Sequence, residues 1–456
     1  MPMPASASAP FSWARLAGGL VILLTLILAD NRLRFAWDYT PNILFWDQWD
    51  LYNPLFQNEG WWSIFSYQHG PHRQGVGALF TAALAHLTGW DSRGDALLTV
   101  GVTVAATLLA LLLACRCGAR PGLALAAVPV VFLTTRQFES WIGPANPSHG
   151  AFPLLLMILA GLAWFIRTPA WRYAVLALLI LFLVFTGFGL FAGAFGPPLL
   201  FLEAWRLRQS GAHQESRWAA AACAFALLAW VLFFVGYKHQ PAVADFRFPH
   251  ERPWEYLGFS ALMFASYAGW HGHGLWDIVG GGVILVLLAA VACVHGLRIW
   301  RASPSARPVS TVLFIFSAAT VLYCLNTAVG RVSLGWREAP YAPRYITLIV
   351  PGIFALFLHA EGFKSLWGRH LAWGVLVVIS ALPGIRITAE DRQAADWYRR
   401  GRELWSSTYL AKGSQQQANA VTSPDQGFTI HPGDISAKLD HLRRNRLNLF
   451  KPNRPY

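Results

Sequence analysis

The sequence has few charged residues and few cysteines for its length. Only 13% of its 456 residues are charged, whereas an ordinary soluble domain has about 25%. The hydrophobic fraction is 55% and lies in repeated apolar runs, which excludes a single soluble core and predicts a polytopic membrane protein. The five cysteines all lie within or at the ends of apolar runs, so we expect neither disulfide bonds nor a zinc site.

Acidic residues are also scarce, which leaves a net charge of +13. The basic residues are spread through short loops and a tail, so nucleic acid is a poor partner. Anionic lipid headgroups and phosphate-bearing substrates fit this distribution better. The 22 tryptophans and 30 phenylalanines predict aromatic belts at the membrane interfaces, and surfaces on which sugars or lipids could stack.

The apolar runs predict about eleven transmembrane helices, beginning with an uncleaved first span at Trp13–Ala29. The other ten runs lie near 96–114, 122–135, 150–166, 173–188, 190–204, 217–237, 276–298, 309–328, 345–362 and 371–387. With the N-terminus inside, the short inner loops hold many arginines and the longer outer loops hold most acids, which is the positive-inside pattern. A crossing at 76–90 would invert every later loop, so we interpret this stretch as a surface-lying or re-entrant helix.

Two regions follow from this topology. Residues 1–387 form the transmembrane domain, whose first outer loop is 31–95. Residues 388–456 form a short C-terminal tail that we expect to be outside and partly helical, with a polar linker at Gly413–Gly427. The long outer segment Lys238–Trp276 is interpreted as a lid or an acceptor surface.

The first outer loop places acidic residues directly after a membrane span, which indicates a functional role. Asp47 and Asp50 lie three residues apart, so both fall on one face of a helical turn. At a membrane interface one carboxylate can act as a general base while the other positions a hydroxyl or a cation. The alternative is a helix N-terminus at which acids are favourable.

A turn rich in histidine follows in the same loop. His69, His72 and Arg73 flank a Gly-Pro pair, and they could hold a phosphate or a catalytic carboxylate. We expect no cofactor. A divalent cation bound by Asp47, Asp50 and His69 is the alternative.

Arginines gather again at the outer end of two late spans. Arg331 and Arg337 precede Arg344, which lies at the first turn of a span, where a guanidinium is costly unless it is paired. Bidentate pairing with phosphate suits arginine, and snorkelling to headgroups is the alternative. Glu139 lies in a short polar and aromatic outer loop that either faces a sugar or forms a plain turn.

The order of these features resembles the GT-C membrane glycosyltransferases, which include protein O-mannosyltransferases and the lipid A aminoarabinose transferase. These enzymes have an Asp-Glu pair after the first span and a His-Pro-Pro turn before the next helix. Here Asp47-Gln48 and His69-Gly70-Pro71 stand at those places, and the likeness covers roughly residues 10–190. Arg344-Tyr345 is similar to an Arg-Tyr pair of related bacterial membrane proteins.

The resemblance implies a GT-C-like bundle in a bacterial inner membrane, with its active site facing the periplasm. Such an enzyme takes a sugar from a polyprenyl-phosphate donor and gives it to an envelope glycan, lipid or protein. Asp47 is then the candidate base and Asp50 its reserve, while Arg344, with Arg73 or Arg331, stabilises the leaving phosphate. The alternatives are an O-antigen polymerase or ligase, and a non-enzymatic transporter or flippase of lipid-linked sugars. Span centres almost free of charge and the lack of a visible internal repeat disfavour the transporter.

Overall fold

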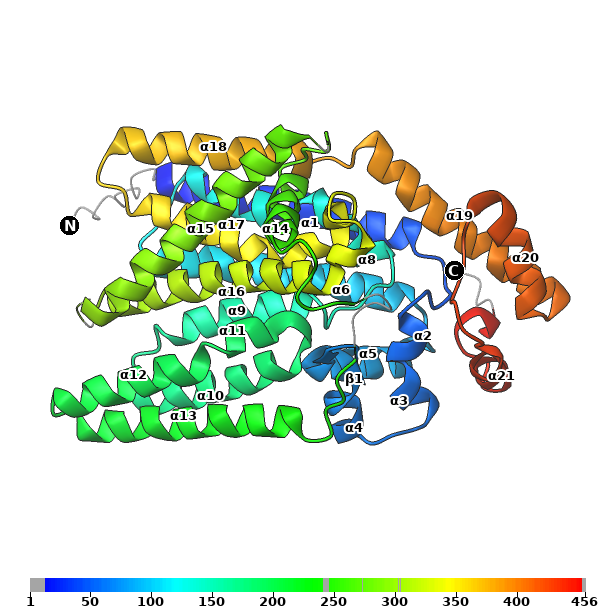
Figure 1. Cartoon of the computed structure of the whole chain (residues 1–456), viewed down its shortest axis with the longest axis horizontal. Helices are drawn as coiled ribbons and strands as arrows, with labels where there is room; N and C mark the ends of the chain where they lie inside the picture. The colour runs from blue at the N-terminus through cyan, green and yellow to red at the C-terminus, as the bar shows by residue number, and fades with distance from the viewer. Residues whose placement is uncertain (1–12, 241–245, 273, 302, 304, 453–456) are drawn as a thin grey trace, which may run out of the picture.

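The computed structural model describes residues 13–240, 246–272, 274–301, 303 and 305–452. The secondary structure in this part is helical, except for a two-stranded antiparallel hairpin of β1 (Gln68–His69) and β2 (His72–Arg73). The long helices run along the long axis of the molecule (Figure 1). The chain is therefore the all-α protein that its apolar runs predict.

Eight segments of the described chain are long and apolar enough to cross a membrane. They are α1 (Trp13–Tyr39), α6 (Arg93–Arg116), Gly187–Gln209 with α11 (Leu190–Gly193) and α12 (Gly196–Gln209), α13 (His213–Phe234), α15 (Leu275–Arg301), Arg307–Leu334 with α16 (Arg307–Arg331), Pro343–Glu361 with α17 (Val350–Glu361), and α18 (Leu366–Gly384). Three predicted crossings form shorter helices: α7 (Ala127–Phe132), α9 (Ala151–Ala163) and α10 (Pro169–Phe185). The protein is thus a multi-pass membrane protein by helix length and composition, and the count of eleven crossings stays a prediction.

Small residues let these helices approach one another closely. A Cβ on Gly161 of α9 would lie 2.8 Å from a methyl carbon of Leu113 of α6, so a larger residue here would push the Leu113 side chain aside. Along α6, the hydroxyls of Thr99, Thr103 and Thr107 each donate to the carbonyl four residues earlier, which satisfies buried polar groups within the helix.

The first outer loop forms a compact cap on one end of the bundle. It contains α2 (Gln48–Leu51), α3 (Asn53–Phe56), α4 (Trp61–Ser66), the hairpin and α5 (Gly75–Thr88). The N–H of Val76 at the start of α5 donates to Thr186, and the turn after α5 bonds to Asn42, just beyond α1. The structure also extends α1 to Tyr39, so the loop begins later than the predicted residue 31.

The segment Lys238–Trp276, predicted as a long outer loop that forms a lid or an acceptor surface, contains the helix α14 (Trp254–Tyr267). This helix is buried along residues 259–267 and packs against α15, where a Cβ on Gly281 would collide with the carbonyl of Ala261. At 14 residues it is too short to be recognised as a span, which is why the hydropathy pattern misses it.

The C-terminal tail is a helical layer, not a short appendage. It contains α19 (Ala389–Lys412), α20 (Gln415–Gln426), α21 (Ser436–Arg444) and a final 3₁₀ turn, η7 (Asn448–Phe450). The predicted polar linker at Gly413–Gly427 is therefore wrong, because α20 occupies it. Figure 1 shows the tail beside the first outer loop, at the end of the molecule opposite the turns that connect α12 to α13 and α15 to α16.

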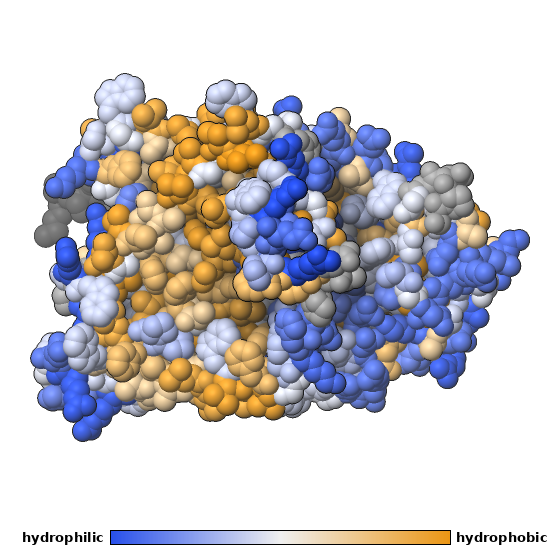
Figure 2. Space-filling view, viewed as in Figure 1, coloured by the Kyte–Doolittle hydropathy of each residue, from blue (hydrophilic) through white to orange (hydrophobic). Residues whose placement is uncertain are grey.

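The tail and the first outer loop share a hydrophobic core. Trp405, Phe428 and Leu439 of the tail pack in one cluster with Trp49 and Trp90 of the loop. Figure 2 shows hydrophilic residues gathered over this end of the molecule, whereas hydrophobic residues cover much of the helical bundle on the same face.

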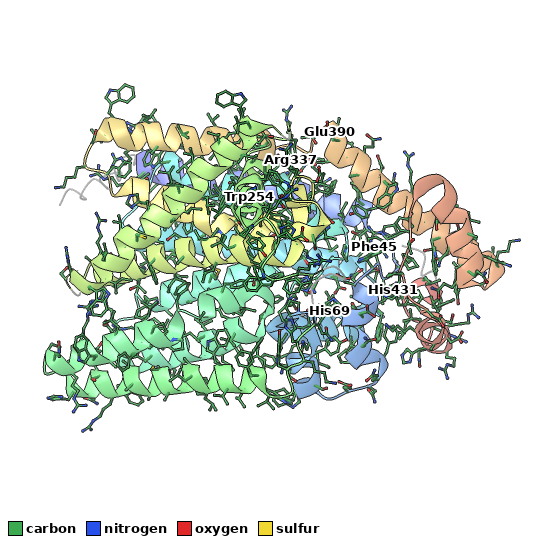
Figure 3. All side chains as sticks on the ribbon, viewed as in Figure 1. Phe45, His69, Trp254, Arg337, Glu390 and His431 are labelled. Carbon is green, nitrogen blue, oxygen red and sulfur yellow. The ribbon has the colours of Figure 1, made fainter. Side chains whose placement is uncertain are left out.

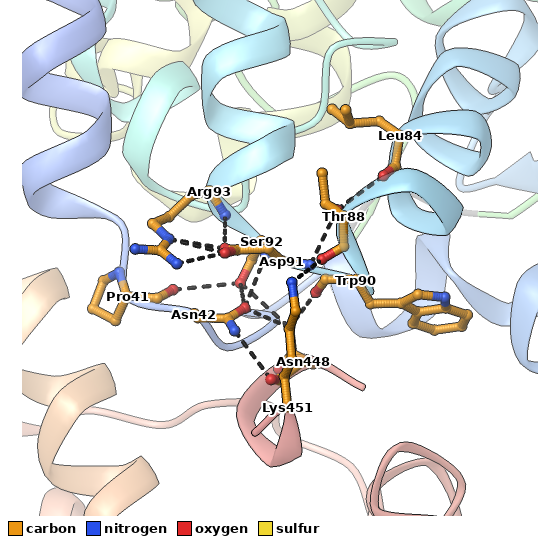
Figure 4. A network of polar contacts seen from close by, with 10 residues as sticks. All are labelled: Pro41, Asn42, Leu84, Thr88, Trp90, Asp91, Ser92, Arg93, Asn448 and Lys451. Atoms are coloured by element: carbon orange, nitrogen blue, oxygen red, sulfur yellow. Dashed lines mark hydrogen bonds and ion pairs between the residues drawn. The ribbon is translucent and has the colours of Figure 1, made fainter. Parts of the chain in front are cut away.

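The last turn of the chain fastens the tail to the loop. Asn448 donates from its side chain to Trp90 O at 2.6 Å and to Asn42 Oδ1 at 3.2 Å, and Asn42 donates in return to Asn448 O at 3.0 Å (Figure 4). Lys451 donates to Thr88 O at 2.8 Å. Three distant segments thus meet in one polar network.

A buried arginine makes a second junction between the tail and the bundle. Arg402 of α19 is fully buried and donates to the carbonyls of Tyr39 and Ile142, which end α1 and α8 (Phe138–Ile142). Helix ends leave carbonyls without partners, and this guanidinium satisfies two of them.

Candidate functional site

The two predicted catalytic acids, Asp47 and Asp50, are held by the glutamine between them. Gln48 is buried and donates to Asp95 Oδ2 at 3.0 Å and to Ala145 O at 3.2 Å, while its own carbonyl oxygen accepts from the N–H of Phe45. A glutamate at position 48 would place two carboxylates together, whereas glutamine supplies the donor that Asp95 needs. Gln48 therefore fixes the turn that carries both acids.

Asp50 is engaged by the tail. Lys438 Nζ lies 3.1 Å from Asp50 Oδ1, and His431 Nε2 lies 3.2 Å from Asp50 Oδ2. The hydrogen bond with His431 and then the charge of Lys438 lower the pKa of Asp50 to about 2. A carboxylate with so low a pKa and two partners is a weak base, so its contacts suit an anchor for the tail.

Asp47 is much less constrained. It precedes α2, its side chain is 42% exposed, and its contact with His69 Nε2 is long at 3.9 Å. The carboxylate therefore keeps lone pairs that a substrate hydroxyl could use. Figure 3 labels His69 in the cap and His431 in the tail.

Three histidines gather next to Asp47. The ring of His72 lies 4.6 Å from that of His149 and 4.6 Å from that of Phe188, and His69 lies 6.3 Å from His149. Gly70 adopts a φ of +61° in the turn of the hairpin that presents His69 and His72. Both ring nitrogens of His72 and Nε2 of His149 are buried, and none of the three has a hydrogen-bond partner in the described part of the chain.

His72 and His149 are neutral because they are buried. The positive charge of Arg331, much later in the chain, lowers their pKa values further. Burial, then the charge of His69, then that of Arg331 lower the pKa of His72 to about 3. Burial, the neighbouring histidines and Arg331 also lower the pKa of His149. Arg331 ends α16, so the electrostatics couple the early loop to a residue more than 250 positions later. We call Asp47, His69, His72, His149 and Arg331 the Asp47 cluster.

The other late arginine belongs to a second group. Arg344 Nη1 donates to Glu139 Oε1 at 2.6 Å, and the hydroxyl of Tyr398 in α19 donates to the same oxygen at 3.2 Å. The carboxylate of Glu139 is buried, whereas the side chain of Arg344 is 49% exposed and keeps donors free for an anion. Tyr345 is buried and its hydroxyl has no hydrogen-bond partner. We call Glu139, Arg344, Tyr345 and Tyr398 the Glu139 cluster.

Aromatic side chains connect the two clusters. Phe45, two residues before Asp47, has its ring 5.6 Å from that of Tyr398. On the other side, Phe188 contacts His72 and also lies 5.4 Å from Tyr323, whose hydroxyl donates to Tyr345 O at 3.3 Å. The two clusters are thus linked through Phe188 and Tyr323, and the segment that carries Asp47 contacts Tyr398 through Phe45.

Arg73, predicted to bind substrate, makes only contacts with the protein in the described part. Its Nε donates to Phe233 O at 2.9 Å and its Nη2 to Val235 O at 2.6 Å, and Nη1 donates to Ser66 O. These bonds cap the end of α13 and tie it to the hairpin.

The described residues form no group of three or more His, Cys, Asp or Glu side chains with the geometry of a metal site. The alternative ligand set of Asp47, Asp50 and His69 is not assembled there, because Asp50 turns toward the tail.

Sequence reasoning misses the tail residues of this region. His431, Lys438 and Tyr398 carry no local motif, and only the folded tail brings them to Asp50 and Glu139. Asp95, buried against Tyr52 and Gln48, is also missed, because it falls where a polar turn enters a span.

We compared the chain with models of known protein families, with characterised proteins and with solved structures. None of the three comparisons finds a match. The functional argument therefore rests on the chemistry of the two clusters.

Proposed function

We propose that this protein is a membrane glycosyltransferase that moves a sugar from a polyprenyl-phosphate donor to a cell-envelope acceptor. The observation that supports this proposal best is the Asp47 cluster. It combines an exposed carboxylate, neutral imidazoles and a guanidinium at the end of an apolar helical bundle. A donor confined to the bilayer needs acid–base and phosphate-binding groups at such a helix end, close to headgroup depth.

In the proposed reaction, Asp47 accepts the proton of an acceptor hydroxyl as that oxygen bonds to the anomeric carbon of the sugar. The bond between the anomeric carbon and the phosphate oxygen breaks, and the polyprenyl phosphate leaves with the electron pair. Attack from the opposite face inverts the anomeric configuration. Arg331 and the exposed guanidinium of Arg344 balance the charge of the leaving phosphate.

The neutral histidines have a separate role in this scheme. His72 and His149 are buried and uncharged at neutral pH, so they add no positive charge that would repel the neighbouring Arg331. Their enclosed ring nitrogens have no hydrogen-bond partner among the described residues, so a sugar hydroxyl would pair with them only by displacing the side chains that cover them. His69 lies beside Asp47 at 3.9 Å, close enough to meet the same acceptor hydroxyl.

We place the active end at the periplasmic face of a bacterial inner membrane, because the short loops of the opposite end are rich in arginine and poor in acids, whereas the loops of the cap end hold most of the acids. Mass spectrometry of envelope glycans from cells with and without the protein tests the proposal. Loss of one sugar from a defined glycan, lipid or protein supports it. Loss of a preassembled repeat would indicate a polymerase or ligase, and movement of lipid-linked sugar without any new glycosidic bond would indicate a transporter.

A further inference from the structure

An apolar hollow lies far from the candidate site, between α12 and the adjoining ends of α15 and α16. It has a cavity volume of about 720 Å³ and an almost wholly apolar lining. Two aromatic contacts bracket it: Phe195 lies 5.1 Å from Phe314 at the deep end, and Trp205 lies 6.3 Å from Trp300 at the other. Trp205 and Trp300 lie in the last turns of α12 and α15, and Figure 1 shows the ends of these helices opposite the cap. We call this hollow the Trp205 groove.

The groove has the depth of one membrane leaflet. Ten residues of α12 separate Phe195 from Trp205, and at 1.5 Å per residue this is about 15 Å. The hydrocarbon core of a bilayer is about 30 Å thick, so the groove covers half of it. Leu297 and Trp300 on the exposed face of α15 are 62% and 61% accessible, which indicates a surface that lipid can reach.

The charge at the open end of the groove is positive and only partly neutralised. Arg307 pairs with Glu203 at 2.9 Å, which leaves Arg206 with no carboxylate of its own. Arg206 follows Trp205 in the chain, and its guanidinium lies 5.3 Å from the centre of the Trp300 ring. Both of its terminal nitrogens are enclosed and have no hydrogen-bond acceptor among the described residues, so a phosphate pairs with them once the Arg206 side chain turns out from Trp300. Enclosed guanidinium donors are costly without an acceptor, and phosphate oxygens match their fork geometry.

We propose that the Trp205 groove binds an anionic glycerophospholipid of the leaflet opposite the cap. One acyl chain lies between α12 and α16, and the phosphodiester accepts hydrogen bonds from Arg206. A leaflet-deep groove fits an acyl chain, whereas the longer chain of a polyprenyl carrier would extend past Phe195 into the packed contact with Phe314. This site is independent of the proposed sugar transfer, which uses the other end of the bundle.

Native mass spectrometry of the full-length protein in detergent tests this site, with phosphatidylglycerol added after delipidation. We expect wild type to retain one molecule, and Arg206→Gln to bind it about tenfold more weakly, because a charge-assisted hydrogen bond is lost. Arg208→Gln is the matched control: it removes the same charge from an exposed position two residues further along α12, and it should bind like wild type.

A second pair of measurements separates the phosphate from the chain. Diacylglycerol, which lacks the phosphate, should bind about as weakly to wild type as phosphatidylglycerol binds to Arg206→Gln. Gly296→Leu, whose added side chain starts 3.4 Å from Phe314 and projects toward the groove, should also reduce retention while keeping Arg206. The proposal fails if Arg206→Gln and Arg208→Gln bind equally. It also fails if undecaprenyl phosphate outcompetes phosphatidylglycerol, or if the groove is closed by a second copy in a lipid-free dimer.

Discussion

The contact between Asp50 and the tail makes a quantitative prediction about how firmly α21 is held. Lys438 donates to Asp50 Oδ1 and also to Trp49 O at 2.7 Å, so one ammonium bridges α21 to the first outer loop. Asp50→Asn keeps the size of the side chain and removes its charge. The change should loosen α21 without disturbing the transmembrane helices.

The pKa of Asp50 sets the size of this effect. Lowering it from 3.8 to about 2 corresponds to at most about 2.4 kcal/mol at neutral pH. The side chain is 39% exposed, and solvent screening reduces the contribution to about 1 kcal/mol. The equilibrium for local opening of α21 should therefore rise about fivefold in Asp50→Asn.

The sign of the pH dependence follows from the same lowered pKa. The folded carboxyl has the lower pKa, so its stabilisation is complete above pH 4 and disappears as the pH falls toward 2. The wild-type tail should therefore loosen over that interval, and Asp50→Asn should show no such step.

Hydrogen exchange of the α21 amides in the detergent-solubilised protein measures this opening. We expect about fivefold faster exchange in Asp50→Asn and faster exchange in Lys438→Met, which also loses the bond to Trp49 O. The double variant should show less than the sum of the two effects, because both single variants remove the same ion pair. Asp440→Asn, an exposed position on the same helix, is the control and should exchange like wild type. Unchanged exchange in Asp50→Asn, or fully additive effects in the double variant, would refute this account of the tail.

Three further predictions concern other positions. Arg402→Met should lower the free energy of unfolding by about 1–3 kcal/mol, since two buried carbonyls lose their donor, and thermal unfolding in detergent would reveal it. Gly187→Ala should lower the free energy of unfolding by more than about 1 kcal/mol and reduce the folded yield, because φ is +50° and the new Cβ meets the carbonyl of Ser148. The control Gly374→Ala, at an open helical position, should be neutral or stabilising. His72 should stay neutral down to a pH of about 3, whereas the same residue in the unfolded chain takes up a proton near pH 6.5, so lowering the pH below 6.5 destabilises the folded protein. The ¹⁵N chemical shifts of the His72 ring measure this, and a titration near pH 6.5 in the folded protein would contradict it.

The transmembrane helices were the most predictable part of the structure. Apolar runs of 17 residues or more are a local property, so the spans near 96–114, 217–237, 276–298 and 309–328 all appear as helices close to their predicted places. The run at 122–135 breaks into a 3₁₀ turn and the six-residue α7, because hydropathy alone carries little information about helix regularity. α14 was missed for its shortness.

The candidate site was predictable only in part. Spacing makes Asp47 and Asp50 equivalent, and the structure distinguishes them because Lys438, 388 residues away from Asp50, pairs with only one of them. The cost of an unpaired guanidinium at the start of a span correctly predicts that Arg344 needs a partner, but not that Glu139 is that partner. Contacts of this kind depend on how the tail folds over the bundle, and no local pattern encodes that.

The central claim is that Asp47 is the base of a sugar transfer while Asp50 anchors the tail. The most direct measurement is transfer of radiolabelled sugar from polyprenyl phosphate to envelope acceptor by the reconstituted protein. The account predicts that Asp47→Asn lowers the rate by about 10²–10⁴-fold, as expected for loss of a general base, whereas Asp50→Asn retains most of it. Full activity of Asp47→Asn together with loss of activity in Asp50→Asn would contradict it.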